Sequence, residues 1–244
     1  MTTTHEPYLK AAGSDRLARY YDVMARLMMP ERRIKGRVIA LARLAPGKRM
    51  LDLGCGTGTL VLMARHRHPD ATVIGVDGDP TILGIARRKA AQAGIAVQLD
   101  EGMAYALPYA DGSFDAVVST LTFHHLTPDQ QARALAEVRR VLRPGGRLVI
   151  ADLAQPHNRL MRLVQRLSLA LRRRHGRHGG AHGEHQPTPP AHHAPALAHL
   201  LATNGWRHAA PTERYMSAIG TIALDTLLRP EMKDAGPNAS DNVL

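Results

Sequence analysis

The fold of this chain is decided by one stretch, Leu51-Asp52-Leu53-Gly54-Cys55-Gly56-Thr57-Gly58, in which a short apolar run leads into three closely spaced glycines. A strand that runs into glycines lets backbone N–H groups approach a ligand, and the helix that follows presents its positive end. Asp77 ends a β-branched stretch 19 residues beyond Gly58. An acid at that place accepts hydrogen bonds from the two hydroxyls of a ribose. The pattern therefore predicts a nucleoside-type site where two parallel strands end.

The spacing of the glycines indicates which class of ligand the loop binds. Dinucleotide sites use G-x-G-x-x-G, because their loop must wrap a pyrophosphate. Here the order is G-x-G-x-G, and this tighter loop suits the amino-acid end of S-adenosylmethionine, which carries a carboxylate and an ammonium. We therefore expect S-adenosylmethionine as the cofactor and disfavour an NAD-linked oxidoreductase.

Outward from the motif, short apolar runs alternate with helical stretches from residue 48 to residue 152, which is typical of a parallel sheet with crossover helices. The pattern predicts strands at 49–53, 72–77, 97–101, 114–119 and 147–152, and helices at 59–67, 80–93 and 127–141. The sheet is completed by a predicted helix at 196–203 and by predicted strands near 206–211 and 218–224. The expected fold class is α/β: a Rossmann-like, doubly wound, mostly parallel seven-stranded sheet with helices on both faces.

Two additions flank this core. Residues 1–44 are predicted to form an N-terminal helical cap, divided at Pro30, and a helical and loop insertion follows the fifth strand. The catalytic domain is expected at 45–230, including a loop rich in His, Gly and Pro at 175–195. Residues 231–244 are expected to be a disordered tail.

Composition bounds the class of protein. A chain of 244 residues suffices for one α/β domain, and none of its stretches approaches the roughly 18–20 consecutive apolar residues of a membrane span. The N-terminal residues lack the order of a secretory signal. Cys55 is the only cysteine, which excludes an internal disulfide and a cysteine-based zinc cluster. We expect a cytoplasmic protein.

The net charge of +11 is unevenly distributed. Seven arginines lie in residues 159–177, and residues 157–174 form a basic amphipathic pattern. Such a helix can lie on a membrane surface as a peripheral contact, or it can pack on the sheet with solvated arginines. Because the charge is so local, nucleic acid is disfavoured as a partner, and the oligomeric state is left open.

Several segments of the chain resemble a known family of enzymes. Met50 to Gly58, Asp77, Leu107-Pro108-Tyr109 with Ser113-Phe114-Asp115, and the run from Glu137 to Gly146 are similar to class I S-adenosylmethionine-dependent methyltransferases. The similarity is greatest to the ubiquinone/menaquinone-biosynthesis type (methyltransferase type 11), whose N-terminal region the stretch Tyr21-Asp22-Val23-Met24 also resembles. The resemblance covers roughly residues 20–152.

The resemblance implies a set of cofactor contacts. Gly54, Gly56 and Thr57 would surround the methionine part, Asp77 would hold the ribose, and Met103 and Ala104 would border the adenine. Thr120 would line the cleft. The remaining candidates are the neighbours of these residues: Asp52, Cys55 and Gly78. Many relatives carry an acidic or amide residue where Met103 stands, whereas Met103 can only pack against the ring.

Two histidines are the candidate catalytic residues. Because the sulfonium methyl group is already activated, transfer needs in-line placement and exclusion of water, and it needs a base only where the nucleophile must lose a proton. His124 and His125 follow the fourth strand, where one of them can serve as that base or where both simply shape the pocket. A second histidine group at 175–185 lies among glycines that disfavour a helix, so we expect no metal.

The sequence thus predicts an enzyme that moves a methyl group from S-adenosylmethionine to a small acceptor by direct displacement. Apolar residues in 15–30 and 155–200 favour a hydrophobic or amphipathic acceptor, such as a quinone-like compound or a lipid precursor. The alternative is a non-catalytic regulatory protein that binds the cofactor and contacts nucleic acid or membrane through a basic arm.

Overall fold

The computed structural model describes residues 29–154, 194–217 and 220–229. Its elements are, in chain order, α3 (Glu31–Ala42), β1 (Arg49–Leu53), α4 (Thr59–Arg67), β2 (Thr72–Asp77), α5 (Pro80–Gln92), β3 (Gln98–Glu101), β4 (Phe114–Thr120), the 3-10 turn η1 (Phe123–His125), α6 (Pro128–Val141), β5 (Leu142–Ala154), α8 (Ala194–Thr203), β6 (Arg207–His208), β7 (Glu213–Ser217) and β8 (Gly220–Leu228).

The predicted elements from residue 49 to residue 141 and the helix at 196–203 are confirmed to within about two residues, whereas β5 begins at Leu142 and runs through the predicted Pro-Gly-Gly break. The last part of the sheet differs more: β6 ends three residues before the predicted end at 211, β8 ends four residues beyond the predicted end at 224, and β7 was not predicted. Of the two helices predicted around Pro30, α3 is the second, and the first lies outside the described residues. The basic helix at 157–174, most of the loop at 175–195 and the tail at 231–244 also lie outside them. The proposed boundaries of the cap, the catalytic domain and the tail therefore stay predictions.

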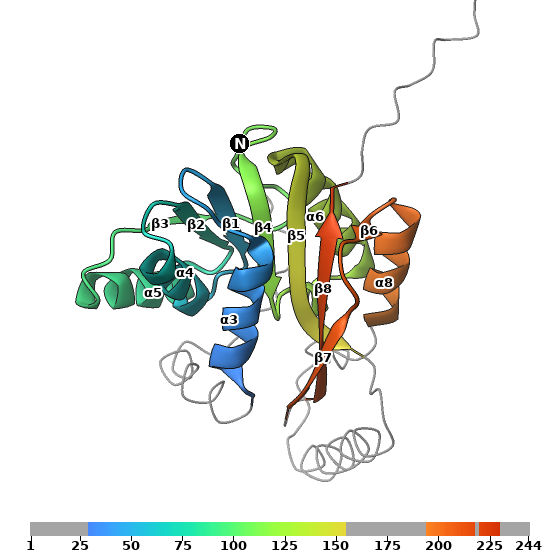
Figure 1. The fold of residues 1–244 in the computed structure, drawn as a ribbon, viewed down its shortest axis with the longest axis horizontal. Coiled ribbons are helices and arrows are strands. Elements are labelled where there is room, and N and C mark those ends of the chain that lie inside the picture. The colour runs from blue at the N-terminus through green and yellow to red at the C-terminus, as the bar shows by residue number, and fades with distance from the viewer. Residues whose placement is uncertain (1–28, 155–193, 218–219, 230–244) are drawn as a thin grey trace, which may run out of the picture.

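The strands form one sheet in the order β3-β2-β1-β4-β5-β8-β6 (Figure 1). Strands β1 to β5 are parallel, and β8 runs antiparallel to β5. The order reverses between β1 and β4, so the crevice beyond their carboxyl ends is the place where such sheets bind ligands. This confirms the doubly wound, mostly parallel α/β class.

The sheet has eight strands where seven were expected, because the edge strand beside β8 is interrupted. Both β6 and β7 pair with the same edge of β8, from Arg207 opposite Leu228 to Ser217 opposite Gly220. Pro211 lies in the gap between them and has no N–H to donate to a ladder.

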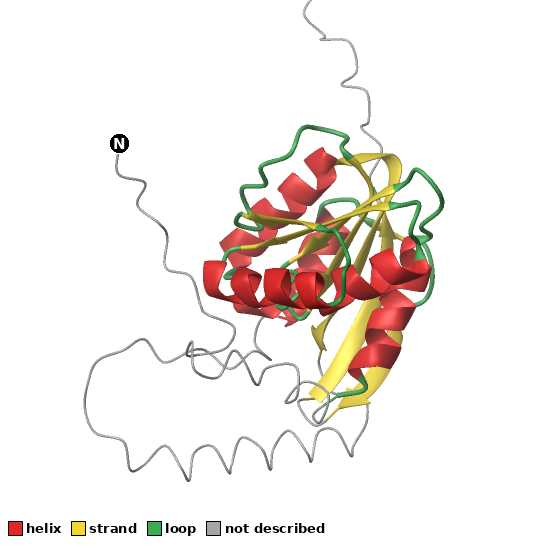
Figure 2. Ribbon diagram, turned by 90° about the vertical axis from the view of Figure 1, so that its left-hand side faces the viewer, coloured by secondary structure: helices red, strands yellow, loops and turns green. Residues whose placement is uncertain are grey.

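Helices cover both faces of the sheet. Apolar residues of α3, α4 and α5 pack on one face, and those of α6 and α8 pack on the other. Figure 2 views the sheet from the β3 side and shows helices on both sides of its twist. Among the described residues, every helix is too short or too polar to cross a membrane.

Two caps fix where the helices nearest the crevice begin. The carboxylate of Asp79 accepts the N–H of Thr81 at 2.9 Å and starts α5. Thr127 and Gln130 form a reciprocal capping box at the start of α6. Each cap satisfies backbone donors that a helix start leaves unpaired, and each is followed by proline at the first helical position.

Candidate functional site

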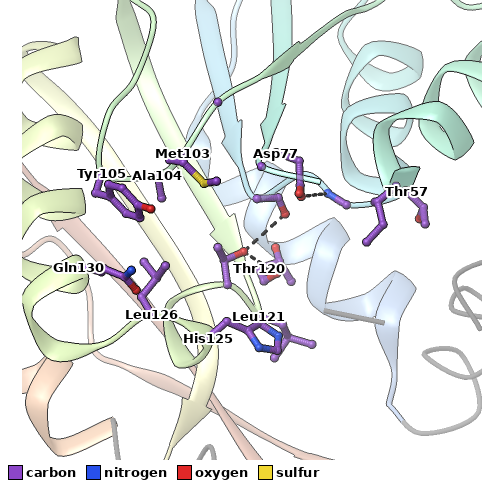
Figure 3. A pocket seen from close by; sticks show the side chains of 16 residues that line it. Thr57, Asp77, Met103, Ala104, Tyr105, Thr120, Leu121, His125, Leu126 and Gln130 are labelled. Atoms are coloured by element: carbon purple, nitrogen blue, oxygen red, sulfur yellow. Dashed lines mark hydrogen bonds between the residues drawn. The ribbon is translucent and has the colours of Figure 1, made fainter. Parts of the chain in front are cut away.

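A cavity lies at the carboxyl ends of β1, β2 and β4, at the point where the strand order reverses (Figure 3). Its walls come from the glycine loop, the end of β2, the segment after β3, and the segment from the end of β4 to the start of α6. The lining residues are Gly54, Gly56, Thr57, Asp77, Gly78, Ile82, Gly102, Met103, Ala104, Tyr105, Thr120, Leu121, Thr122, His125, Leu126 and Gln130.

Most of the residues predicted for the site meet in this cavity. Among the candidate contacts, Asp52, Cys55 and His124 do not line it. Lining residues that the sequence reasoning missed come mainly from the two segments that follow β3 and β4. Gln130 is one of them, and its position three residues after Thr127 signals only the start of α6, which borders the cavity.

The three glycines of the loop all have positive φ values: +71° for Gly54, +55° for Gly56 and +74° for Gly58. This left-handed region disfavours residues with a Cβ. At Gly54 a Cβ would also lie 2.3 Å from Oγ1 of Thr122, so the loop after β4 closes against this glycine. At Gly58 a Cβ would meet Ala86 at 3.0 Å, so this glycine permits α4 and α5 to approach.

Gly56 differs from the other two glycines because it borders open space. The nearest heavy atom to a Cβ at Gly56 is Cγ2 of Ile82, at 4.0 Å, and both residues line the cavity. The space beside Gly56 is therefore kept for something other than protein atoms.

The sequence predicted that the N–H groups of the loop approach a ligand, but several of them donate to the protein itself. The N–H groups of Gly54 and Cys55 donate to the carbonyl of Val76, at 2.8 and 3.0 Å, and the N–H of Gly58 donates to Cys55. The N–H of Gly56 donates to Oδ2 of Asp77 at 2.8 Å. These bonds hold the loop onto β2. The main contribution of the glycines to the site is therefore space for a ligand, and not hydrogen-bond donors.

Asp77 is the acid at the end of β2, and its side chain is held in place. Besides the bond from Gly56, its Oδ1 accepts the N–H of Asp79 at 3.0 Å. The residue is 8% exposed and lines the cavity. Each carboxylate oxygen can accept more than one hydrogen bond, so Asp77 can still receive the hydroxyls of a ligand.

Asp52 and Cys55 face the core on the α3 and α4 side of the loop. Asp52 is 2% exposed, and burial raises its pKa to about 7, with Asp77 adding to the rise and Lys35 opposing it. Burial raises the pKa of the Cys55 thiol far above its ordinary value, which makes it an inert packing residue. Any influence of these two residues on a ligand would thus be indirect.

The segment that follows β4 contains a strained residue at the cavity wall. Leu121 has φ +57°, a rare value for a residue with a side chain, and its N–H donates to the carbonyl of Ala151 at 2.8 Å. Such conformations cluster at ligand-binding and catalytic sites. Beside it, Thr120 lines the cavity, and its buried Oγ1 has no hydrogen-bond partner among the described residues.

His124 and His125 follow in η1. Their rings contact each other, with centroids 4.0 Å apart and planes inclined by 39°. His125 lines the cavity, whereas His124 turns to Asp152 of β5, with 2.6 Å between Nδ1 and Oδ1. The pKa of His125 is lowered to about 4, mainly by burial and also by the neighbouring His124, while Asp152 opposes the shift. His125 is therefore a neutral imidazole at pH 7.

Comparison with known proteins identifies the family. A family model described as a methyltransferase domain matches residues 50–146. A demethylmenaquinone methyltransferase of Thermus thermophilus is 42% identical over 153 residues, which cover 62% of this chain and 69% of that protein. The chain belongs to the S-adenosylmethionine-dependent methyltransferases of the ubiquinone/menaquinone-biosynthesis type.

Two further comparisons agree with this membership. A ubiquinone/menaquinone biosynthesis C-methyltransferase of Geobacter sulfurreducens is 31% identical over 153 residues, covering 61% of this chain and 59% of that protein. The crystal structure of an S-adenosylmethionine-dependent methyltransferase from Aquifex aeolicus superposes with a TM-score of 0.62 at 17% identity, over 88% of this chain and 98% of the other. At that identity the structural match supports the fold of this methyltransferase, and not its acceptor.

Proposed function

We propose that this methyltransferase transfers the methyl group of S-adenosylmethionine to a ring carbon of a quinol-type acceptor that carries an apolar tail. The observation that carries the proposal is the position of His125, whose imidazole lines the same cavity as the glycine loop and Asp77. The Thermus relative is a demethylmenaquinone methyltransferase and the Geobacter relative a C-methyltransferase of ubiquinone/menaquinone biosynthesis, which supports the choice of a quinone ring and of carbon as the attacking atom.

The cavity fits the cofactor. Gly54, Gly56 and Thr57 would border the methionine part, where Gly56 leaves open space. Asp77, with Gly78 beside it, would accept the ribose hydroxyls. Thr120 would line the cleft beside them. These assignments use groups whose positions are already fixed by the protein, which lowers the ordering cost of binding.

The adenine would lie against the segment that follows β3. Met103 and Ala104 line the cavity there, next to Tyr105. Arg133 stacks over the Tyr105 ring at 4.5 Å and holds that ring in place. Since Met103 offers no hydrogen-bond acceptor of ordinary strength, the adenine would be held here mainly by packing.

When bound, the cofactor supplies a methyl group on a positively charged sulfur, which is already activated for displacement. The task of the protein is then to align the acceptor and to take up a proton. A quinol hydroxyl would give its proton to the unprotonated ring nitrogen of His125 as electron density moves onto the adjacent ring carbon. That carbon would form the new C–C bond while the S–C bond breaks and its electron pair stays on sulfur, which leaves a neutral thioether. The carbon would then release its own hydrogen as a proton to solvent, and His125 would return the first proton to the quinol oxygen.

The tail of the acceptor would lie outside this cavity. Residues 15–30 and 155–200 are proposed to cover the acceptor, and residues 157–174 to bring the protein to the membrane surface where a lipid-like quinone resides. These segments lie almost entirely outside the described residues, so both statements depend on the sequence alone.

The proposal is tested by assaying the purified protein with labelled S-adenosylmethionine and a reduced quinone that lacks the ring methyl group. The expected result is one methyl group per ring, with transfer lowered about 100-fold or more by His125→Ala, since a general base contributes roughly 10²–10⁴-fold. Transfer to a polar metabolite in preference to the quinol would refute the proposed acceptor. Full activity of His125→Ala would refute the proposed base.

A further inference from the structure

Asp152 is a buried acid that the sequence reasoning did not single out. It lies near the carboxyl end of β5, is 4% exposed, and also borders a second cavity formed with α8 and β8. Its carboxylate is fully engaged: Oδ1 accepts the N–H of Leu153 at 2.6 Å and lies 2.6 Å from Nδ1 of His124, and Oδ2 accepts the backbone N–H of His124 at 3.2 Å.

This arrangement fixes both the backbone and the ring of His124. An ionised carboxylate can only accept hydrogen bonds, so Nδ1 of His124 must carry the proton. The ring is thereby confined to one tautomer and one orientation, in the manner of a histidine held by a carboxylate in other catalytic sites. The side chain of His124 is 10% exposed, so water competes little for this bond.

The held ring in turn supports His125. The two imidazoles contact each other at 4.0 Å between centroids, and only His125 reaches the cavity. The contacts therefore form a continuous path from Asp152 through His124 to His125 and the cavity. The charged or titratable groups that act on His125 are His124 and Asp152, and the carboxylate favours a proton on His125.

We propose that Asp152 is a positioning residue for methyl transfer, which acts through His124 to hold the His125 imidazole toward the acceptor and to strengthen it as a proton acceptor. The catalytic part of this inference rests on the function proposed above. The positional part, that Asp152 holds the two rings in contact, can be tested without any acceptor.

The positional test uses the full chain at pH 7 and compares Asp152→Asn with a matched control, Asp225→Asn. Asp225 is an acid on the adjacent strand β8, where its Oδ1 accepts the hydroxyl of Thr212 at 2.6 Å and lies 3.7 Å from Nδ1 of His208. Because aromatic rings in contact shift one another's NMR signals, Asp152→Asn is expected to move the ring signals of His125 and Asp225→Asn is not. Unchanged His125 signals in Asp152→Asn would overturn the inference.

The catalytic test is a double-mutant cycle on the methylation of a reduced quinone. Asp152→Asn is expected to lower kcat about tenfold or more while S-adenosylmethionine binds with unchanged affinity by calorimetry. In the His125→Ala background it is expected to have no further effect. If the two effects multiply, or if Asp152→Asn alone leaves kcat unchanged, Asp152 does not act through His125.

A second variant guards against poor folding of Asp152→Asn. His124→Asn keeps a donor close to the place of Nδ1 but removes the ring, and it is expected to lower kcat by a similar factor while the melting temperature stays close to that of the parent. Full activity of His124→Asn would overturn the inference. If the parent itself methylates no quinol, the proposed function fails, and the NMR comparison still decides whether Asp152 holds the rings.

Discussion

Replacement of Gly56 by alanine tests whether the open space beside the glycine loop receives the cofactor. Loss of cofactor binding reports on that space, and loss of stability reports on the cost of a left-handed backbone conformation. A side chain at Gly56 would adopt φ +55° and would meet nothing closer than Ile82, at 4.0 Å, inside the cavity. The new methyl group is therefore expected to fill cofactor space and not to disturb the protein core.

The magnitudes follow from the structure. An L-residue in the left-handed region costs about 1–2 kcal/mol, and the reduced freedom of the unfolded chain offsets about 0.4–1 kcal/mol of this. Gly56→Ala should then destabilise the fold by roughly 1 kcal/mol, or about 2–4 °C in melting temperature. Its dissociation constant for S-adenosylmethionine should rise at least about tenfold, which corresponds to about 1.4 kcal/mol.

Two variants calibrate the measurement. Gly47 has φ +74°, and a Cβ there would meet nothing within 4 Å, so Gly47→Ala carries the same backbone cost outside the cavity. Gly54 has φ +71°, but its Cβ would lie 2.3 Å from Thr122, so Gly54→Ala adds overpacking of about 1–3 kcal/mol. Stability is measured by chemical denaturation and binding by calorimetry.

The expected pattern is that Gly47→Ala loses stability only, Gly56→Ala loses a similar amount of stability and also binding, and Gly54→Ala loses the most stability. Equally tight binding of S-adenosylmethionine by Gly56→Ala and Gly47→Ala would contradict the placement of the cofactor beside Gly56. In that case the open space beside Gly56 does not receive the cofactor.

Three further predictions follow from the site. Asp77→Asn should weaken S-adenosylmethionine binding about 10-fold or more in calorimetry, because it places an amide against the N–H of Gly56 and weakens an acceptor for the ribose; unchanged affinity would remove Asp77 from the site. Met103→Asp should bind S-adenosylmethionine at least as tightly as the parent, since an acceptor there can bond the adenine amine, and much weaker binding would contradict the placement of the adenine. Asp52 has a folded pKa of about 7, above the roughly 3.9 of an unfolded chain, so the folded protein holds an extra proton between pH 4 and 7 and loses stability as the pH rises through that window. Asp52→Asn should therefore raise the free energy of unfolding by about 2–4 kcal/mol at pH 8 and by little at pH 4, and an equal effect at both pH values would count against a buried, protonated Asp52.

The part of the site that follows β1 and β2 was predictable from the sequence because the signals there are local. Three glycines at fixed spacing and an acid at the end of the next strand appear directly in the chain, and parallel strands bring them to one edge of the sheet. The direction of the loop amides was not predictable in this way. Whether the N–H of Gly56 meets a ligand or Asp77 depends on the exact approach of the loop to β2, which spacing does not specify.

The segments that follow β3 and β4 were harder to predict. Their residues reach the cavity through irregular backbone, as at Leu121, so no periodicity marks them. The sequence also did not show that His124 bonds Asp152 while His125 lines the cavity. Asp152 is 28 residues from His124 in sequence and lies beside it only because β4 and β5 pair.

The most direct test of the account is to incubate the full chain with S-adenosylmethionine labelled with ¹³C in its methyl group and with a reduced demethylmenaquinone, and to locate the label by mass spectrometry and NMR. We expect a single labelled methyl group on a ring carbon of the quinol, formed by the parent and about 100-fold more slowly by His125→Ala. This expectation would be contradicted by an unlabelled quinol under conditions in which the protein binds S-adenosylmethionine, or by a label on a quinol oxygen.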